Sequence, residues 1–187
     1  MKALLTSVAL LLAAAVGRAG DKTPVAWADL PGIDGKTHSL AELKDKAVVV
    51  VAITRDRCPM AVRYFQKMNE FVAAEPAAAL VAVNLEEGDT LDTMGRVARD
   101  RGFKFPYLRD ASQDLGRKLG AVGTPEFFVL NRAREVIYRG AWDDGLPAGK
   151  VKGHYVEDAV KAALAGKAPA VTETKPIGCS ISYRDAR

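Results

Sequence analysis

The sequence predicts an α/β domain in which helices cover both faces of a central mixed β-sheet. Two continuous apolar runs, 48–53 and 78–85, are typical of buried central strands because they consist largely of Val, Ile, Leu and Ala. A segment with helical periodicity follows each run, and a strand pair and a last helix come after them. This order of elements builds a layered sheet with helices on both sides. With 187 residues the chain is long enough for one domain with a substantial core.

Before the first buried run, the pattern predicts a β-hairpin extension. Residues 25–33 and 36–40 form its two arms, joined by Asp34-Gly35, a dipeptide that supplies the positive φ of a tight turn. Ser39 is placed to cap the short helical turn that follows.

Apolar residues spaced three and four positions apart predict four longer helices, at 59–74, 90–101, 112–119 and 156–164. Pro76 ends the first of them, and Gly102 and Gly120 end the second and third. Three shorter extended pieces are expected at 105–108, 126–130 and 136–139. The last two are separated by a polar turn and should therefore pair as an antiparallel hairpin.

The two ends of the chain differ in character from the domain at 20–167. Residues 1–19 resemble a cleaved secretory signal, with a basic Lys2, an apolar run and the small-residue site Gly17-Arg18-Ala19. Arg18 next to the cleavage site leaves an uncleaved anchor as the alternative. Residues 168–187 carry Cys179 and show no helical or strand period, so this irregular tail either wraps the domain or hangs free.

These features predict an exported protein, periplasmic or extracellular, with no stable membrane insertion after cleavage. Removing the leader takes away two basic residues and no acid, so the net charge falls from +4 to +2. Basic residues are scattered among acidic ones, and no nucleic-acid partner is expected. The chain has two cysteines, an even count in a compartment where disulfides persist, so Cys58 and Cys179 are considered as a pair.

Cys58 stands where the first buried run gives way to a helix. Unpaired N–H groups and the positive end of the helix dipole favour a thiolate there, and Pro59 fits the first helical turn. Three arginines near it in the sequence should lower its pKa further, and Asp56 opposes them; the arginines are Arg55, Arg57 and Arg63. The alternative is a buried, inert cysteine.

The order of elements, the helix-opening cysteine and the segment Gly123-Thr124-Pro125-Glu126 together resemble the thioredoxin-like superfamily. The resemblance spans roughly residues 24–167. It implies a cis bond between Thr124 and Pro125, lying against Cys58. Within the superfamily the chain is similar to exported redoxins related to alkyl hydroperoxide reductases and thiol-specific antioxidants, the peroxiredoxin-like group. The motifs that carry this likeness are Cys58-Pro59, 105–108, 124–126, 139–144 and 174–181.

The chain departs from both parent motifs. Thioredoxins carry Cys-x-x-Cys, and the second position here is Ala61. Peroxiredoxins carry Pro-x-x-x-Thr-x-x-Cys, and the first two of those positions are Val51 and Arg55. The buried acid of thioredoxins corresponds to Ala52. Neither parent mechanism therefore transfers intact.

The resemblance implies a thiol-disulfide oxidoreductase or a peroxiredoxin-like peroxidase. In this hypothesis Cys58 attacks a protein disulfide or a peroxide and Cys179 resolves the product, with Pro59, Thr124, Pro125 and Arg57 supporting the site. A thiol electron-donor protein would restore the pair, and no cofactor is expected.

Three other hypotheses stay open. A permanent Cys58–Cys179 disulfide would pin the tail, stabilising the fold by roughly 4–5 kcal/mol in the chain-entropy model. A second alternative is that Cys58 acts alone as a monothiol, with Cys179 free. A copper-handling protein would use Cys58 and Met60 with His38 or His154, although Val62 replaces the second cysteine of that pattern. The acids at 86–89 and 143–144 are interpreted as solvated turns.

Overall fold

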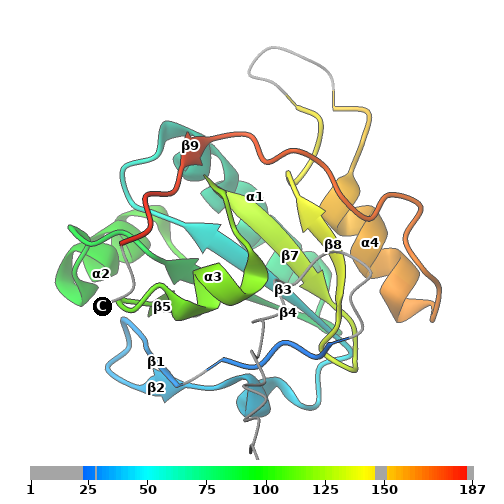
Figure 1. The fold of residues 1–187 in the computed structure, drawn as a ribbon, viewed down its shortest axis with the longest axis horizontal. Coiled ribbons are helices and arrows are strands. Elements are labelled where there is room, and N and C mark those ends of the chain that lie inside the picture. The colour runs from blue at the N-terminus through cyan, green and yellow to red at the C-terminus, as the bar shows by residue number, and fades with distance from the viewer. Residues whose placement is uncertain (1–22, 28, 146–150, 185–187) are drawn as a thin grey trace, which may run out of the picture.

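The computed structural model describes residues 23–27, 29–145 and 151–184. The predicted signal, 1–19, lies outside these residues. A five-stranded sheet forms the centre of the fold (Figure 1), with its strands in the order β5-β4-β3-β7-β8. Their bounds are β3 (Val48–Thr54), β4 (Ala78–Asn84), β5 (Tyr107–Arg109), β7 (Glu126–Leu130) and β8 (Val136–Gly140). β3, β4 and β5 are parallel, whereas β7 is antiparallel to β3 and β8 is antiparallel to β7.

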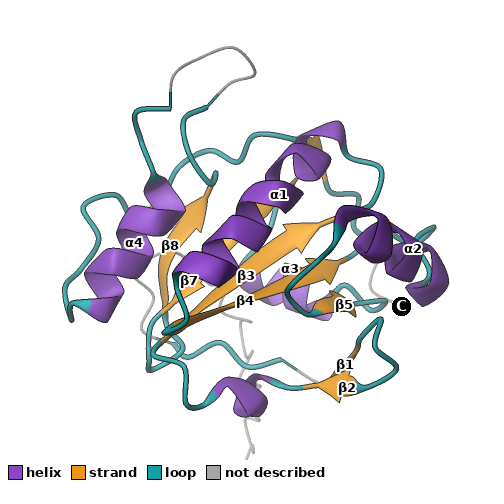
Figure 2. Cartoon of the chain, turned by 180° about the vertical axis from the view of Figure 1, so that it is seen from behind, coloured by secondary structure: helices purple, strands orange, loops and turns teal. Residues whose placement is uncertain are grey.

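Helices cover both faces of this sheet, as the sequence predicts (Figure 2). Side chains at Val48, Val50 and Ala52 of β3 belong to the core cluster under α1 (Pro59–Ala74), α2 (Leu91–Arg101) and α4 (Tyr155–Leu164). The alternate residues of β3 point to the opposite face, where α3 (Asp114–Leu119) and the N-terminal segment pack. β3 is therefore buried on both faces, which explains its continuous apolar sequence.

The expected helix ends are confirmed, with small shifts that have local causes. Gly102 and Gly120 end α2 and α3 in the left-handed region, with φ of 60° and 66°. α3 begins later than predicted because Gln113, directly before it, is itself left-handed. β5 begins at Tyr107 rather than at 105 because Pro106 has no N–H to donate to a sheet ladder.

The N-terminal hairpin is present but its strands are short, β1 (Leu30–Pro31) and β2 (Thr37–His38). Gly35 makes the tight turn with a φ of 76°. The short turn η1 (Leu40–Leu43) follows, and here the expectation for Ser39 is wrong: it occupies the cap position, but its side chain makes no capping hydrogen bond. No helix among the described residues is long and apolar enough to span a membrane.

The C-terminal tail wraps the domain, so of the two arrangements left open by the sequence the docked one is observed. It runs across β8 and then past the end of the sheet (Figure 1). The backbone N–H of Arg139 donates to the Thr172 carbonyl at 3.0 Å, and the Thr174 N–H donates to the Arg139 carbonyl at 3.0 Å. Further on, β9 (Cys179–Ser180) pairs antiparallel with β6 (Gly123–Thr124), a small sheet that the sequence patterns did not predict.

Candidate active site

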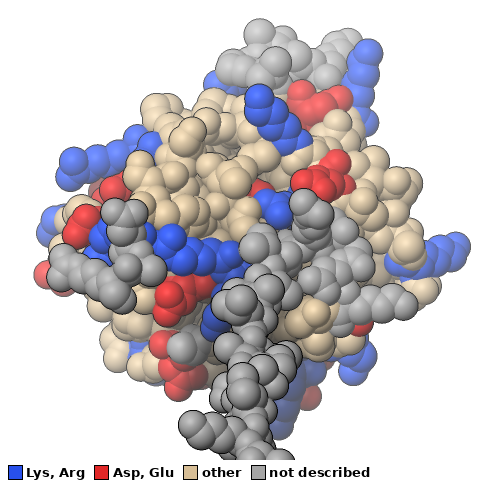
Figure 3. All heavy atoms as spheres, in the orientation of Figure 1, with Lys and Arg blue, Asp and Glu red and all other residues tan. Residues whose placement is uncertain are grey.

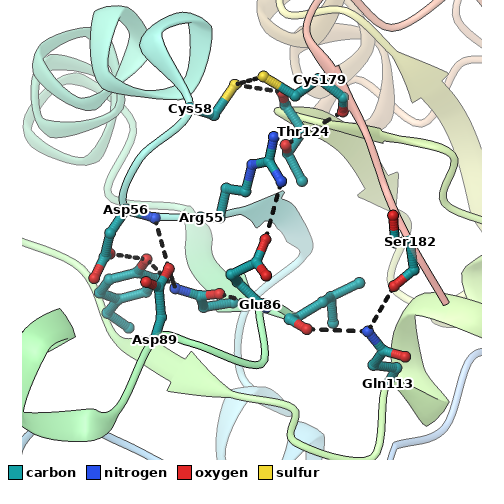
Figure 4. A network of polar contacts seen from close by, with 12 residues as sticks. Arg55, Asp56, Cys58, Glu86, Asp89, Gln113, Thr124, Cys179 and Ser182 are labelled. Carbon is teal, nitrogen blue, oxygen red and sulfur yellow. Dashed lines mark hydrogen bonds and ion pairs between the residues drawn. The ribbon is translucent and has the colours of Figure 1, made fainter. Parts of the chain in front are cut away.

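Cys58 occupies the cap position of α1, where β3 has ended and Pro59 opens the helix. The residue is buried, with 0% of its surface exposed. Its thiol donates to the Thr124 carbonyl oxygen, at an Sγ···O distance of 3.0 Å. The Sγ atom of Cys179 lies 2.9 Å from the Sγ of Cys58 (Figure 4). The fold therefore brings together the two cysteines that are 121 positions apart in the chain.

The loop before β7 and the tail hold this geometry. The Thr124-Pro125 bond is cis, as the resemblance implies. Thr124 pairs directly with Cys179 in the β6–β9 ladder, so the tail strand lies beside the Cys58 thiol. Gly178 packs so closely against the Thr124 carbonyl that any Cβ at this position would overlap with it. The tail therefore approaches Cys58 with its backbone in close contact with β6.

The pKa of the Cys58 thiol is set by opposing effects. Burial raises this pKa, because the thiolate loses hydration, but hydrogen bonds from the Cys179 side chain and from the backbone at Ala61, Cys179 and Met60 stabilise the thiolate. The hydrogen bonds outweigh burial and lower the pKa to about 7. The direction of this shift agrees with the acidic thiol expected at a helix start.

The arginine that contacts the cysteine pair is Arg55, and the role expected of Arg57 is not supported. Arg57 is exposed, and its charge acts on the nearby Asp56 carboxyl rather than on Cys58. Arg55 points from the end of β3 toward the pair (Figure 4), so that its guanidinium faces the Cys179 side chain, and it pairs with Glu86 at 2.9 Å. These contacts, the one with Cys179 first, raise the guanidinium pKa above its usual value.

Glu86 is a site residue that sequence reasoning missed. The sequence pattern predicts a solvated acidic turn at this position. In the structure the Glu86 carboxylate accepts a hydrogen bond from Arg55 and holds it beside Cys179. The signal was available: Glu86 follows the second buried strand as Arg55 follows the first. The carboxyl ends of adjacent parallel strands lie at one edge of a sheet, so the two side chains are neighbours.

Asp89, which was also expected in solvent, is buried beside a second acid, Asp56. Asp89, 2% exposed, accepts hydrogen bonds from the Asp56 N–H at 3.0 Å and from the Asn84 amide at 2.9 Å. The Tyr107 hydroxyl donates to the other carboxyl, on Asp56, at 2.6 Å. This polar cluster fixes the loop that leads into Cys58. Burial and the Asp89 charge raise the pKa of the Asp56 carboxyl.

Asp143 is likewise buried, although a solvated turn was expected there. It is 2% exposed and accepts hydrogen bonds from the Tyr64 hydroxyl at 2.8 Å and from the Lys67 ammonium group. It therefore ties the end of β8 to α1, whereas the neighbouring Asp144 remains on the surface. Sequence patterns did not distinguish the two adjacent acids, because only the packing of α1 selects one of them.

The copper hypothesis gains no support from the described residues. His38 lies between Asp34 and Glu42, with ring nitrogens 3.0 and 3.1 Å from their carboxylates, and His154 pairs with Glu157. Both histidines are thus engaged away from Cys58. No group of three or more Cys, His, Asp or Glu side chains in the described part of the chain is arranged to hold a metal ion.

Comparisons with known proteins agree with this architecture. A family model described as the AhpC/TSA family matches residues 19–139. No curated protein matches the chain. Among solved structures, the hypothetical protein SMc02350 from Sinorhizobium meliloti 1021 is 32% identical with a TM-score of 0.81, and the match covers 97% of this chain and 98% of that one.

Two other solved structures extend the likeness. An uncharacterized conserved protein from Geobacillus kaustophilus is 26% identical with a TM-score of 0.80, and the match covers 94% of this chain and 96% of that one. The bacterioferritin comigratory protein of Xanthomonas campestris, whose structures concern alkyl peroxide reduction, is 19% identical with a TM-score of 0.55; the match covers 74% of this chain and 90% of that one. At that identity the likeness shows the fold alone, which is thioredoxin-like.

Proposed function

This chain belongs to the AhpC/TSA family of thioredoxin-like redoxins, and on that premise we propose that it is a thiol-dependent oxidoreductase whose Cys58 and Cys179 alternate between dithiol and disulfide. One observation carries the proposal. The thiol with the lowered pKa, at the start of α1, lies 2.9 Å from the second sulfur. A disulfide bond is roughly 2.05 Å long, so a small side-chain movement closes the gap.

The chemistry balances with a peroxide as oxidant. The Cys58 thiolate attacks one oxygen of a hydroperoxide ROOH, the O–O bond breaks, and the products are a sulfenic acid and an alcohol. The Cys179 sulfur then attacks the sulfenic sulfur, forming the disulfide and releasing water. A dithiol donor returns the pair to its reduced state by two thiol–disulfide exchanges.

Burial of Cys58 favours a small peroxide over a protein disulfide as the substrate. With the tail docked, Cys58 has 0% of its surface exposed, and the Cys179 side chain stands over it. A small hydroperoxide needs less of the tail to move than a folded protein disulfide, which is too large to reach a buried thiol while β9 stays paired with β6. A protein disulfide is the second candidate, in which Cys179 would release the mixed disulfide from Cys58.

Arg55 is proposed to stabilise the developing thiolate of Cys179. Its guanidinium faces that side chain, and the ion pair with Glu86 fixes its orientation. Cys179 needs to be ionised to attack the sulfenic acid, and it becomes a thiolate again if exchange expels it from the disulfide. A fixed cation beside it favours both steps.

A purely structural disulfide is less well supported than a redox-active one. Hydrogen bonds on both sides of Cys179 already hold the tail, at Thr172 and Thr174 before it and at Arg184 after it. The tail is therefore docked beside Cys58 without needing a covalent bond. A thiolate stabilised at a helix start instead makes a disulfide easier to reduce.

The reduction potential of the Cys58–Cys179 pair tests the proposal. Alkylation and peptide mass mapping of the protein across a dithiol buffer series should give a value of roughly −120 to −270 mV, the range of working redox couples. A reduction potential below about −300 mV would instead identify a structural disulfide.

Peroxide turnover by two variants then distinguishes the roles of Cys58 and Cys179. Cys58→Ser should abolish peroxide consumption. Cys179→Ser should allow one turnover per molecule and leave a sulfenic acid on Cys58, detectable with a dimedone probe. Full retention of turnover in Cys179→Ser, at the rate of the unaltered protein with the same donor, would exclude the resolving role. Consumption of a protein disulfide but not of peroxide would select the second substrate class.

We also infer export to the periplasm or the cell exterior, supported by the leader pattern at 1–19. N-terminal sequencing of the protein from a fractionated producing cell should find a chain that begins at or near Gly20. A protein retained in the cytoplasm with its original N-terminus would exclude export.

A further inference from the structure

Gln113 has an unusual backbone conformation for its residue type. It has a φ of 64° and a ψ of 15°, in the left-handed region, directly before α3. That region is unfavourable for a residue with a Cβ, and Gly, Asn and Asp adopt it far more readily than Gln. The side chain is also buried, at 3% exposure. A strained, buried polar residue needs a reason in its contacts.

The Gln113 amide joins the sheet to the tail. Its Nε2 donates to the Leu85 carbonyl at the end of β4, at 3.2 Å, and to the Ser182 carbonyl of the tail, also at 3.2 Å. Its Oε1 accepts from the Arg184 N–H at 2.9 Å. One buried side chain thus holds two alternate residues of the tail against the carboxyl edge of the sheet, and Figure 4 shows its contact with Ser182.

This contact lies close to Cys179 along the tail. Ser182 is three residues after Cys179, a short distance in extended chain at roughly 3.3 Å per residue. On the other side of Cys179, Thr174 is hydrogen-bonded to Arg139 of β8. The tail is therefore hydrogen-bonded to the domain on both sides of Cys179, and these contacts keep the Cys179 sulfur next to Cys58.

The effective concentration of Cys179 at Cys58 depends on this docking. In a freely moving tail, the residues between the end of α4 at Leu164 and Cys179 would form a flexible tether, so Cys179 would meet Cys58 for only part of the time. When the tail is docked, the Cys179 sulfur stays next to the Cys58 sulfur. When the competent arrangement is populated for only a fraction of the time, the apparent equilibrium constant for disulfide formation is the intrinsic constant multiplied by that fraction.

We propose that Gln113 is a positioning residue that clamps the tail beside Cys179 and thereby sets the equilibrium between the dithiol and the disulfide. This inference rests on the proposed redox role of the pair. It adds to that role a residue outside the cysteine motifs, 66 positions before Cys179, which acts through the tail. Removing the clamp should leave Cys58 itself at the start of α1 but weaken the disulfide, because Cys179 is no longer held beside it.

Two substitutions separate the clamp from the strained backbone. Gln113→Gly removes every side-chain contact and relieves the left-handed strain, so the domain should still fold. Gln113→Glu keeps the length, the strain and an acceptor for the Arg184 N–H, but it loses the amide donor to Ser182 and Leu85. The matched control is Gln66→Ala, because Gln66 is exposed on α1 and bonds only its helix neighbour Glu70 in the described structure.

The measurement is the equilibrium constant for disulfide formation in the full-length protein, in a dithiothreitol series read by alkylation and mass mapping. Both Gln113 variants should lower it at least tenfold, which is a potential about 30 mV less negative. Gln66→Ala should match the unaltered protein. A constant unchanged in Gln113→Gly would overturn the clamp. A reduction potential below about −300 mV in the unaltered protein would contradict the proposed function instead. The ratio of the equilibrium constants of variant and unaltered protein would still test the role of Gln113.

Discussion

At Cys58, burial and hydrogen bonding shift the thiol pKa in opposite directions. Burial alone would make the thiol less acidic than a free cysteine. Hydrogen bonds from Cys179 and from the backbone at Ala61 and Met60 reverse this and bring the pKa to about 7. About half of the thiol is therefore ionised near neutral pH, so reactivity should rise with pH through about 7 and level off above it.

Replacing Cys179 with Ala should make Cys58 less acidic. The Cys179 side chain is the largest of the groups that lower the Cys58 pKa, so its removal shifts the midpoint of the thiolate absorbance titration upward. The thiolate fraction at pH 7 should fall from about half toward the few per cent of an ordinary cysteine. Arg57→Gln is the control, since Arg57 is exposed and should leave the midpoint unchanged. An upward shift in Arg57→Gln would restore the role that the sequence suggested.

At the scale of elements, the site is built where three chain segments meet. α1 supplies Cys58 and the N–H groups that stabilise its thiolate, β6 supplies the Thr124 carbonyl, and β9 supplies Cys179. β6 and β9 each contain two residues, so their pairing depends on close backbone contact rather than on a long ladder. Gly178 allows this approach, because it has no side chain to meet Thr124.

Gly178→Ala should separate the tail from β6. Its Cβ would overlap with the Thr124 carbonyl, so the tail strand has to move away and Cys179 with it. The rate of disulfide formation with a mild oxidant, followed by loss of free thiols, should fall by about tenfold or more. Gly88→Ala is the matched control, because nothing lies within 4 Å of a Cβ there. An unchanged rate in Gly178→Ala would show that the β6–β9 contact does not place the sulfur.

For the molecule as a whole, local patterns predicted the domain and missed the long-range contacts that complete the site. The buried strands, the helices and their glycine ends follow from periodicity and backbone preferences within short windows. Docking of the tail depends on partners that are distant in the sequence. Sequence patterns likewise did not show that Arg55 rather than Arg57 lies beside the cysteines, or that Asp89 and Asp143 are buried. Neighbouring residues of one type differ only in what packs against them.

The structure also changes how the tail relates to the domain. The sequence placed the domain boundary near 167 and gave the tail no core of its own. In the structure, Ile181 and Tyr183 pack against the core cluster on the α3 face of the sheet, and the Tyr183 hydroxyl donates to the Ala121 carbonyl at 2.7 Å. Arg117 stacks on the Tyr183 ring, with 4.7 Å between the guanidinium carbon and the ring centroid. The tail is thus part of the folded unit.

A chain that ends at Lys167 should therefore be less stable than the full chain, even with both proteins reduced. Losing the partial burial of Ile181 and Tyr183 and the hydrogen bonds of the tail should cost about 3 kcal/mol, which is roughly 6–12 °C in unfolding temperature for a domain of this size. Cys179→Ser keeps these contacts and should unfold within about 2 °C of the full chain under the same reducing conditions. Equal unfolding temperatures for the shortened and full chains would mean that the tail is an appendage, and its docking would then contribute to redox chemistry without contributing to the fold.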